Sequence, residues 1–189
     1  MTKVKKSSIL LTCLLLALLC GLLFYIDGNA SKYIIRITRL CAINIVLALS
    51  MNLVNGFTGI FSLGHAGFMA IGAYTVALLT IPVAKKETIF MLEPLIAPLN
   101  TLTLPFGAAL IIGGLLAAAL AFLIGLPCLR LRGDYLAIAT LGFSEIIRIV
   151  ITNAQSLTNG AQGLKSIPAT ANIWWCYGIA LATIIFIAL

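Results

Sequence analysis

Long apolar runs separated by short polar segments dominate this chain. A helix that crosses a hydrocarbon core of about 30 Å needs roughly 20 apolar residues, and six runs approach that length. The pattern predicts an all-α protein, a polytopic transmembrane helical bundle with about six spans. We expect the spans at residues 8–26, 34–54, 66–84, 105–126, 135–152 and 173–189, within one transmembrane domain that covers residues 1–189.

The first apolar run has two interpretations. Lys3, Lys5 and Lys6 precede it and a Gly-Asn-Ala sequence follows at residues 28–30, as in a secretory signal peptide. Its uncharged core is longer than the roughly 7–15 residues that are usual in such peptides. We therefore favour a retained signal anchor and keep a cleaved signal peptide as the alternative.

Polar positions recur at helical spacing on two of the expected spans. The second span carries Asn44, Asn52 and Asn55. The fifth span carries a second set near one face: Thr140, Ser144, Glu145 and Arg148. A polar face inside a membrane is expected to meet protein or water, so the two spans could line a shared path. The alternative is interhelical hydrogen bonding that only fixes packing. Glu145 and Arg148 are three residues apart, a spacing that predicts an ion pair.

The fourth span has a different pattern. Gly113, Ala117 and Ala121 form a series of small residues four apart, and no ionisable residue interrupts the run. Such a series is typical of a helix that packs closely against a neighbour.

A glycine-rich segment interrupts the apolar pattern between the second and third spans. Gly56, Gly59, Gly64 and Gly67 fall within thirteen residues, so a continuous helix is not expected. Irregular backbone at membrane depth is tolerated where it is buried in protein or lines a cavity. A helix that restarts near Ser62 would point its N–H groups at the break, which suits a carboxylate. The alternative is a tight cytoplasmic hairpin with Ser62 as the N-cap.

Composition excludes an ordinary soluble domain. The chain is 62% hydrophobic and 9% charged, against roughly 45–50% and about 25% in soluble proteins. The net charge of +7 comes from short basic clusters between apolar runs, which indicates membrane topology and no nucleic-acid partner. The chain has no GxxxxGK[ST] motif for ATP, and His65 is its single histidine. We expect no catalytic site, no metal site and no cofactor bound by this chain.

Basic residues between the spans bear on orientation. The N-terminal lysines together with Arg130 and Arg132 place the N-terminus and the loop before the fifth span in the cytoplasm. Alternation then puts six basic residues outside against five inside, so the rule alone does not settle the topology. Asp134 precedes the fifth span and is expected to cap its free N–H groups, while the two arginines hold the cytoplasmic interface.

Three sequence blocks resemble a known family. The first comprises MNL at residues 51–53, SLGH at 62–65 and IGAY at 71–74. The second is LRLRGDYLAIATLGFSEIIR at 129–148, and the third is LTNGAQGL at 157–164. In this order and spacing they resemble branched-chain amino-acid ABC permeases of the LivM type. Asn159 stands where the family often has glycine, and asparagine also tolerates left-handed turns.

The resemblance implies a membrane-spanning permease subunit of an ATP-driven importer in the bacterial cytoplasmic (inner) membrane. It also implies partners: a second related permease, two cytoplasmic ATPase subunits that use the ATP, and a periplasmic or lipid-anchored substrate-binding protein. The alternatives are a permease for urea or another small polar solute, and an ion-coupled secondary carrier that uses Glu145. A membrane scaffold without transport would leave the polar faces without a purpose beyond packing.

Candidate site residues follow from these patterns. For the translocation path they are Asn44, Asn52, Asn55, Ser62, Gly64, His65, Thr140, Ser144, Glu145 and Arg148. For the external loop they are Thr158, Asn159, Gly160 and Gly163, and for the cytoplasmic interface Arg130, Arg132 and Asp134. The apolar run after residue 173 ends at Leu189 with no charged flank. We therefore expect a truncated chain that lacks further helices and the loop that docks on the ATPase.

Overall fold

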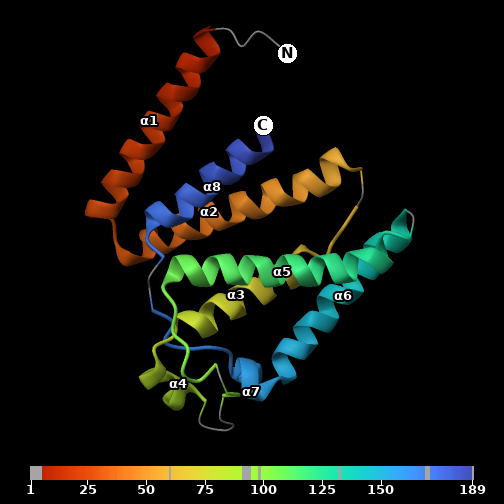
Figure 1. Ribbon diagram of the computed structural model, residues 1–189. Helices are drawn as coiled ribbons and strands as arrows, with labels where there is room; N and C mark the ends of the chain where they lie inside the picture. Colours follow the sequence, from red (N-terminus) through yellow and green to blue (C-terminus); the bar gives the residue numbers. More distant parts are fainter. Residues whose placement is uncertain are drawn as a thin grey trace. The chain divides into compact units, whose positions relative to one another are not determined.

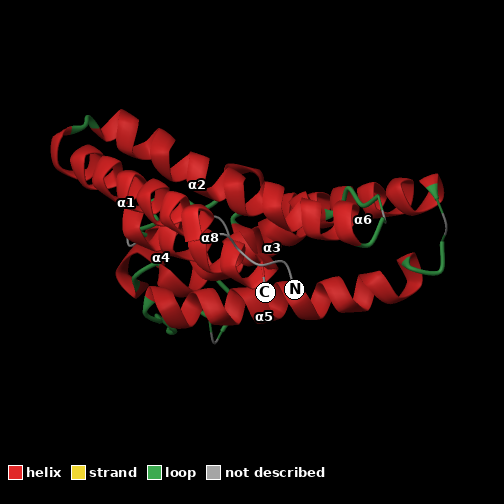
Figure 2. Cartoon of the chain, turned by 90° about the horizontal axis from the view of Figure 1, so that it is seen from above, coloured by secondary structure: helices red, strands yellow, loops and turns green. Residues whose placement is uncertain are grey.

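The computed structural model describes residues 6–59, 61–90, 95–97, 99–131, 133–168 and 171–188. Throughout this part of the chain the regular elements are helices (Figures 1 and 2), which confirms the all-α prediction. They are α1 (Lys6–Asn29), α2 (Lys32–Asn52), a π-helical turn η1 (Leu53–Phe57), α3 (His65–Thr80), α4 (Val83–Ile89), α5 (Phe106–Cys128), α6 (Asp134–Asn153), α7 (Gln155–Thr158), a 3-10 turn η2 (Gly160–Gln162) and α8 (Ile173–Ala188).

Three of these helices are long and apolar enough to cross a membrane: the continuous run Lys32–Phe57, α5 and α6. The bent pair α3 and α4 would make a fourth if the two together form one span. Two further apolar helices, Leu18–Asn29 and Ile173–Ile187, are shorter. The count of about six spans therefore stays a prediction. Many large apolar side chains of the long helices are exposed, such as Phe122 and Leu123, as expected for surfaces that face lipid or other helices.

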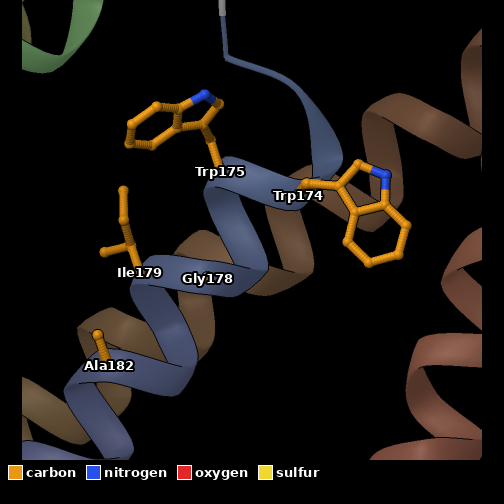
Figure 3. A pocket seen from close by; sticks show the side chains of 5 residues that line it. All are labelled: Trp174, Trp175, Gly178, Ile179 and Ala182. Carbon is orange, nitrogen blue, oxygen red and sulfur yellow. The ribbon is translucent and has the colours of Figure 1, made fainter.

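The chain forms two compact units. The first comprises residues 1–49 and 171–189, and the second comprises residues 50–170. In the first unit, Tyr177 of α8 donates a hydrogen bond from its hydroxyl to the carbonyl of Thr38 in α2, at 3.3 Å. Trp174 and Trp175 project in different directions from the start of α8, with Gly178 one turn further on (Figure 3). This pair of rings has the composition of an interfacial aromatic belt.

In the second unit, α3 and α5 pack closely along their length. A Cβ atom built at Gly113 of α5 would lie 2.8 Å from the Val76 side chain and 3.1 Å from the Gly72 carbonyl oxygen of α3. Only a residue without a side chain allows this approach. The small-residue face of α5 is thus a packing surface, as its sequence predicts.

Candidate translocation site

The site begins where α2 ends. The helix widens into the π-helical turn η1, and the Thr58 hydroxyl then donates to the Val54 carbonyl. Gly59 follows with φ +68°, a left-handed conformation that favours glycine and turns the chain out of the helix. The predicted glycine-rich helix break is therefore present between α2 and α3.

Two side chains hold the segment after the break. The backbone N–H of Ser62 donates to Asn55 Oδ1 at 3.1 Å, and the N–H of Leu63 donates to Thr140 Oγ1 at 3.1 Å. The Thr140 hydroxyl in turn donates to the Ala137 carbonyl at 3.0 Å, which orients its oxygen as an acceptor. An irregular segment at membrane depth needs such partners because no water is there to satisfy its backbone.

The position of Thr140 shows how far along α6 the break lies. Asp134 begins α6 and Thr140 lies six residues later, which at about 1.5 Å per residue is roughly 9 Å along the helix. The segment therefore runs beside α6 for more than one turn before α3 begins. The break therefore lies beside the body of α6 and not only beside its first residue.

The first turn of α3 packs against α6. Gly64 is buried, and a Cβ there would lie 3.4 Å from the Thr140 carbonyl oxygen. A Cβ at Gly67 would lie 3.0 Å from both Ser144 Cα and the Ile147 side chain. The structure thus brings the glycines at the start of α3 onto the predicted polar face of α6.

The start of α3 corrects one interpretation of the sequence. The helix begins at His65, with Gly64 at the N-cap position and no side-chain cap, so Ser62 is not the N-cap. The reason is that the Ser62 N–H is directed to Asn55 and the regular helix begins only after Gly64. His65 Nδ1 is buried and has no hydrogen-bond partner among the described residues.

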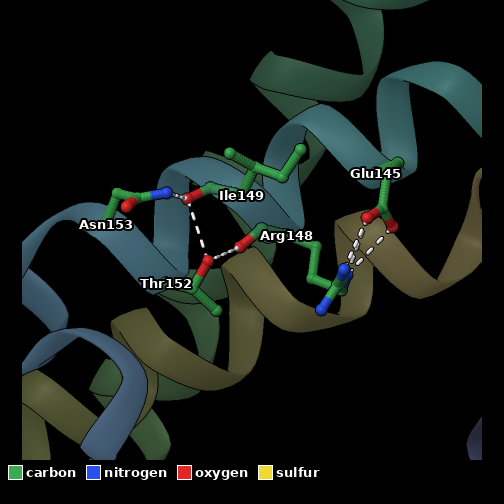
Figure 4. Close-up of polar contacts among 5 residues, drawn as sticks. All are labelled: Glu145, Arg148, Ile149, Thr152 and Asn153. Carbon is green, nitrogen blue, oxygen red and sulfur yellow. Dashed lines mark hydrogen bonds and ion pairs between the residues drawn. The ribbon is translucent and has the colours of Figure 1, made fainter.

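The predicted ion pair on α6 is present. Arg148 Nε donates to both carboxylate oxygens of Glu145 at 3.1 and 2.9 Å, and Nη2 reaches Oε1 at 2.5 Å (Figure 4). The side chains of Arg148 and Glu145 are 68% and 52% exposed in this chain. One turn later, the Thr152 hydroxyl donates to carbonyls of its own helix (Figure 4). The pair therefore lies on an outer face of α6.

The remaining path residues are Asn44 and Asn52. Asn52 is exposed at the end of α2. Asn44 belongs to the first unit. A role for either residue in a shared path stays a prediction.

The turn between α5 and α6 corrects a second expectation. Gly133 precedes α6 with φ +59°, and no side chain caps the helix, so Asp134 is its first residue and not its cap. Its carboxylate in the first turn still interacts favourably with the helix dipole. Arg130 is exposed, and Arg132 lies outside the described residues. A cavity of about 420 Å³ at this turn is lined in part by Gly59 and Phe61, so the helix break begins at this end of α6.

The predicted external loop is a self-bonded turn. Asn159 adopts the left-handed conformation at φ 60°, as the sequence suggested, and its Nδ2 donates to the Gly163 carbonyl at 3.1 Å. The buried Thr158 hydroxyl donates to the Ala154 and Ile151 carbonyls. Gly160 also has positive φ, and a Cβ there would lie 3.1 Å from the Gln155 side chain. These residues build the loop and have their polar groups occupied within it.

One buried cation, Lys86, was not predicted from the sequence, where it is one of the six basic residues that alternation places outside. Its side chain is 1% exposed, and Nζ donates to the carbonyls of Leu99 at 2.6 Å and Leu102 at 2.7 Å. Burial lowers the pKa of this ammonium from its ordinary value of 10.5. No local signal distinguishes Lys86 from its exposed neighbour Lys85.

Comparison with known proteins identifies the family. The model of the family described as the permease component of branched-chain amino acid transport systems matches residues 33–187, which include all three sequence blocks. The chain belongs to this family.

Two curated relatives of this permease chain carry the description "High-affinity branched-chain amino acid transport system permease protein LivM". The protein of Escherichia coli (strain K12) is 44% identical over 138 residues, and that of Salmonella typhimurium (strain LT2) is 42% identical over 138 residues. Each alignment covers 73% of this chain but 28% of the relative, so the chain spans about a quarter of their length. No solved structure matches the chain.

Family membership and apolar helices make this permease chain a membrane protein. The described residues contain no group of three or more His, Cys, Asp or Glu side chains that could hold a metal ion. The helix break presents hydrogen-bonding backbone and side chains next to α3 and α6.

Proposed function

We propose that this chain is part of the membrane-spanning permease subunit of an ATP-driven importer that moves branched-chain amino acids across the bacterial cytoplasmic membrane. The observation that carries the proposal is the family match over residues 33–187. The printed descriptions of both relatives, which name branched-chain amino acid transport, support the substrate class.

The helix break is the element of this chain that contacts the solute along its path. The first-turn N–H groups of a helix lack intrahelical partners and carry a partial positive charge, so the start of α3 can attract a carboxylate. His65 Nδ1 is a buried polar atom at the same place without a partner among the described residues. The surrounding apolar side chains suit an aliphatic amino acid better than a strongly polar solute.

The energy for transport comes from other subunits. We propose two cytoplasmic ATPases, a second related permease and a periplasmic or lipid-anchored binding protein as partners, with the N-terminus of this chain in the cytoplasm. This chain itself binds no cofactor and has no enzyme activity in the proposal, because it contains no phosphate-binding loop motif.

Uptake by the complex purified from native membranes and reconstituted into liposomes tests the function. We expect uptake of leucine, isoleucine or valine that requires ATP and the binding protein. Uptake of urea in preference to these amino acids would replace the substrate class. Uptake driven by an ion gradient without ATPase subunits would replace the importer by a secondary carrier.

The role of the break is tested with Gly64→Leu, which places a bulky side chain beside Thr140 and Phe68. We expect this variant to lose uptake while the complex assembles in normal amounts. The matched control is Gly107→Leu at the start of α5, where a Cβ meets nothing within 4 Å. Normal uptake by both variants would make the break a mere connector.

A further inference from the structure

The segment between α3 and α5 closes on itself. After Thr80 the chain turns, and α4 is inclined by 119° to α3. The chain then returns, and the N–H of Leu104 donates to the Leu79 carbonyl at 2.8 Å just before α5 begins. The described residues of this connection, 81–90, 95–97 and 99–104, therefore form a cap over the end of α3 that lies away from the helix break, and they are here named the α4 cap.

The α4 cap has a small core of its own. Leu78, Phe90 and Leu95 are buried together, and Leu164 from the loop after α7 packs against them. Two connections that are far apart in sequence thus share one apolar cluster. A cluster of this size stabilises the cap only modestly, because few side chains contribute to it.

The Lys86 ammonium supplies the polar attachment of the α4 cap. Moving an ammonium out of water is costly unless hydrogen bonds replace its hydration. Here Nζ reaches the carbonyls of Leu99 and Leu102, 13 and 16 residues further along the chain. Both carbonyls lie in an irregular segment between α4 and α5. The Lys86 side chain therefore ties the returning segment, residues 99–102, to α4.

We propose that Lys86 is a positioning residue whose ammonium latches residues 99–102 to α4 and keeps the α4 cap closed. Within the proposed permease, the latch fixes the end of α3 opposite the helix break, so that α3 is held at both ends. Lys85, the adjacent residue, points to the exposed side and takes no part in the latch. This role rests on geometry inside one unit and is separate from the choice of transported solute.

Lysine labelling of the native complex in its membrane tests the latch without any substitution. Acetylation with a small amine-reactive reagent, read by tandem mass spectrometry, compares Lys85 with Lys86 in the same peptide. We expect Lys86 to react at least about tenfold more slowly, since a buried amine is reached only through local opening. Equal labelling of the two lysines would overturn the proposal.

Substitution then separates latching from general folding. Lys86→Met keeps the apolar stem but removes the donors, and Lys85→Met is the matched control. We expect amide hydrogen exchange across residues 95–104, including the Leu104 amide, to become at least about tenfold faster in Lys86→Met alone. Exchange around Leu63 at the other end of α3 should stay unchanged in both variants.

Two outcomes of the exchange experiment would also overturn the latch, and both are distinguishable from failure of the proposed function. If exchange across residues 95–104 is unchanged in Lys86→Met, the apolar cluster alone closes the cap. If exchange rises equally across α3, α5 and α6, Lys86 is a general stability residue and not a local latch. Both readouts come from the protein without transport, so a wrong substrate assignment does not affect them.

Discussion

Side chains bind the backbone at both ends of α3, but they bind different groups. At one end they accept from N–H groups, and at the other end a side chain donates to carbonyls. At the helix break the backbone groups that have a side-chain partner in place of a helical one are donors, the N–H groups of Ser62 and Leu63. Neutral oxygens receive them, Oδ1 of Asn55 and Oγ1 of Thr140. At this end no charge has to be buried.

At the α4 cap the backbone groups bound by a side chain are acceptors, the carbonyls of Leu99 and Leu102. The buried cation Lys86 donates to both. A hydrogen bond between neutral groups contributes about 0.5–1.5 kcal/mol, and one to a charged group about 1.5–3 kcal/mol. The two ends of α3 are therefore held by different kinds of hydrogen bond, between neutral groups at the break and from a buried cation at the cap.

The largest effect is expected where the break end leaves no room. Gly67→Leu forces a side chain toward the backbone of Ser144, which a Cβ alone already approaches to 3.0 Å. Overpacking of this kind costs about 1–3 kcal/mol or more, so the thermal midpoint and yield of the purified complex should fall sharply. Gly114→Leu on α5, where a Cβ meets nothing within 4 Å, is the control. Equal behaviour of the two variants would contradict the close contact of α3 with α6.

A smaller effect is expected when the neutral acceptor at the break is removed. Thr140→Val keeps the shape but leaves the Leu63 N–H without its partner, a loss of about 1–3 kcal/mol. Amide exchange at residues 61–64 should rise, while Thr140→Ser should behave like the unchanged protein. Thr75→Val serves as control, because its hydroxyl donates only to the Ile71 carbonyl of its own helix. Exchange that is the same in Thr140→Val and Thr75→Val would show that Thr140 does not hold the segment.

The smallest effect is expected at the exposed ion pair, whose Arg148 is an exposed cation to compare with the buried Lys86. Glu145 and Arg148 satisfy each other on an outer face of α6, so neither depends on the irregular backbone. Glu145→Gln or Arg148→Gln should lower the thermal midpoint of the complex slightly. The double substitution should lower it by less than the sum of the two. Strictly additive changes would mean that the pair does not contribute.

Much of the helical framework and part of the site were predictable from local sequence. The apolar runs gave α5 and α6 to within two residues, because a 20-residue apolar stretch has few other ways to satisfy its backbone in a membrane. Asn159 adopts the left-handed backbone that its residue type tolerates, and the glycine cluster indicated a break in the helix without showing which glycine would be left-handed. The Glu145 and Arg148 pair followed from spacing on a single helix turn.

Contacts between distant residues were not predictable in the same way. The hydrogen bond from Leu63 to Thr140 joins residues that are 77 positions apart, and no periodicity in either segment predicts it. For the same reason the sequence suggested Ser62 as the cap of α3 and Asp134 as the cap of α6. In the structure, Ser62 donates to Asn55 and Gly133 precedes α6.

By itself, the sequence determined an all-α membrane protein with a helix break, because hydrophobic length and glycine content act locally. The permease family was indicated by the resemblance of its three sequence blocks. The tertiary structure alone decided which side chains hold that break and that one of two adjacent lysines is buried. Lys85 and Lys86 are identical in the sequence, but the chain that returns to α3 covers only the second. Burial and the choice of hydrogen-bond partner depend on segments that are distant in the sequence and close in space, so the local pattern does not predict them.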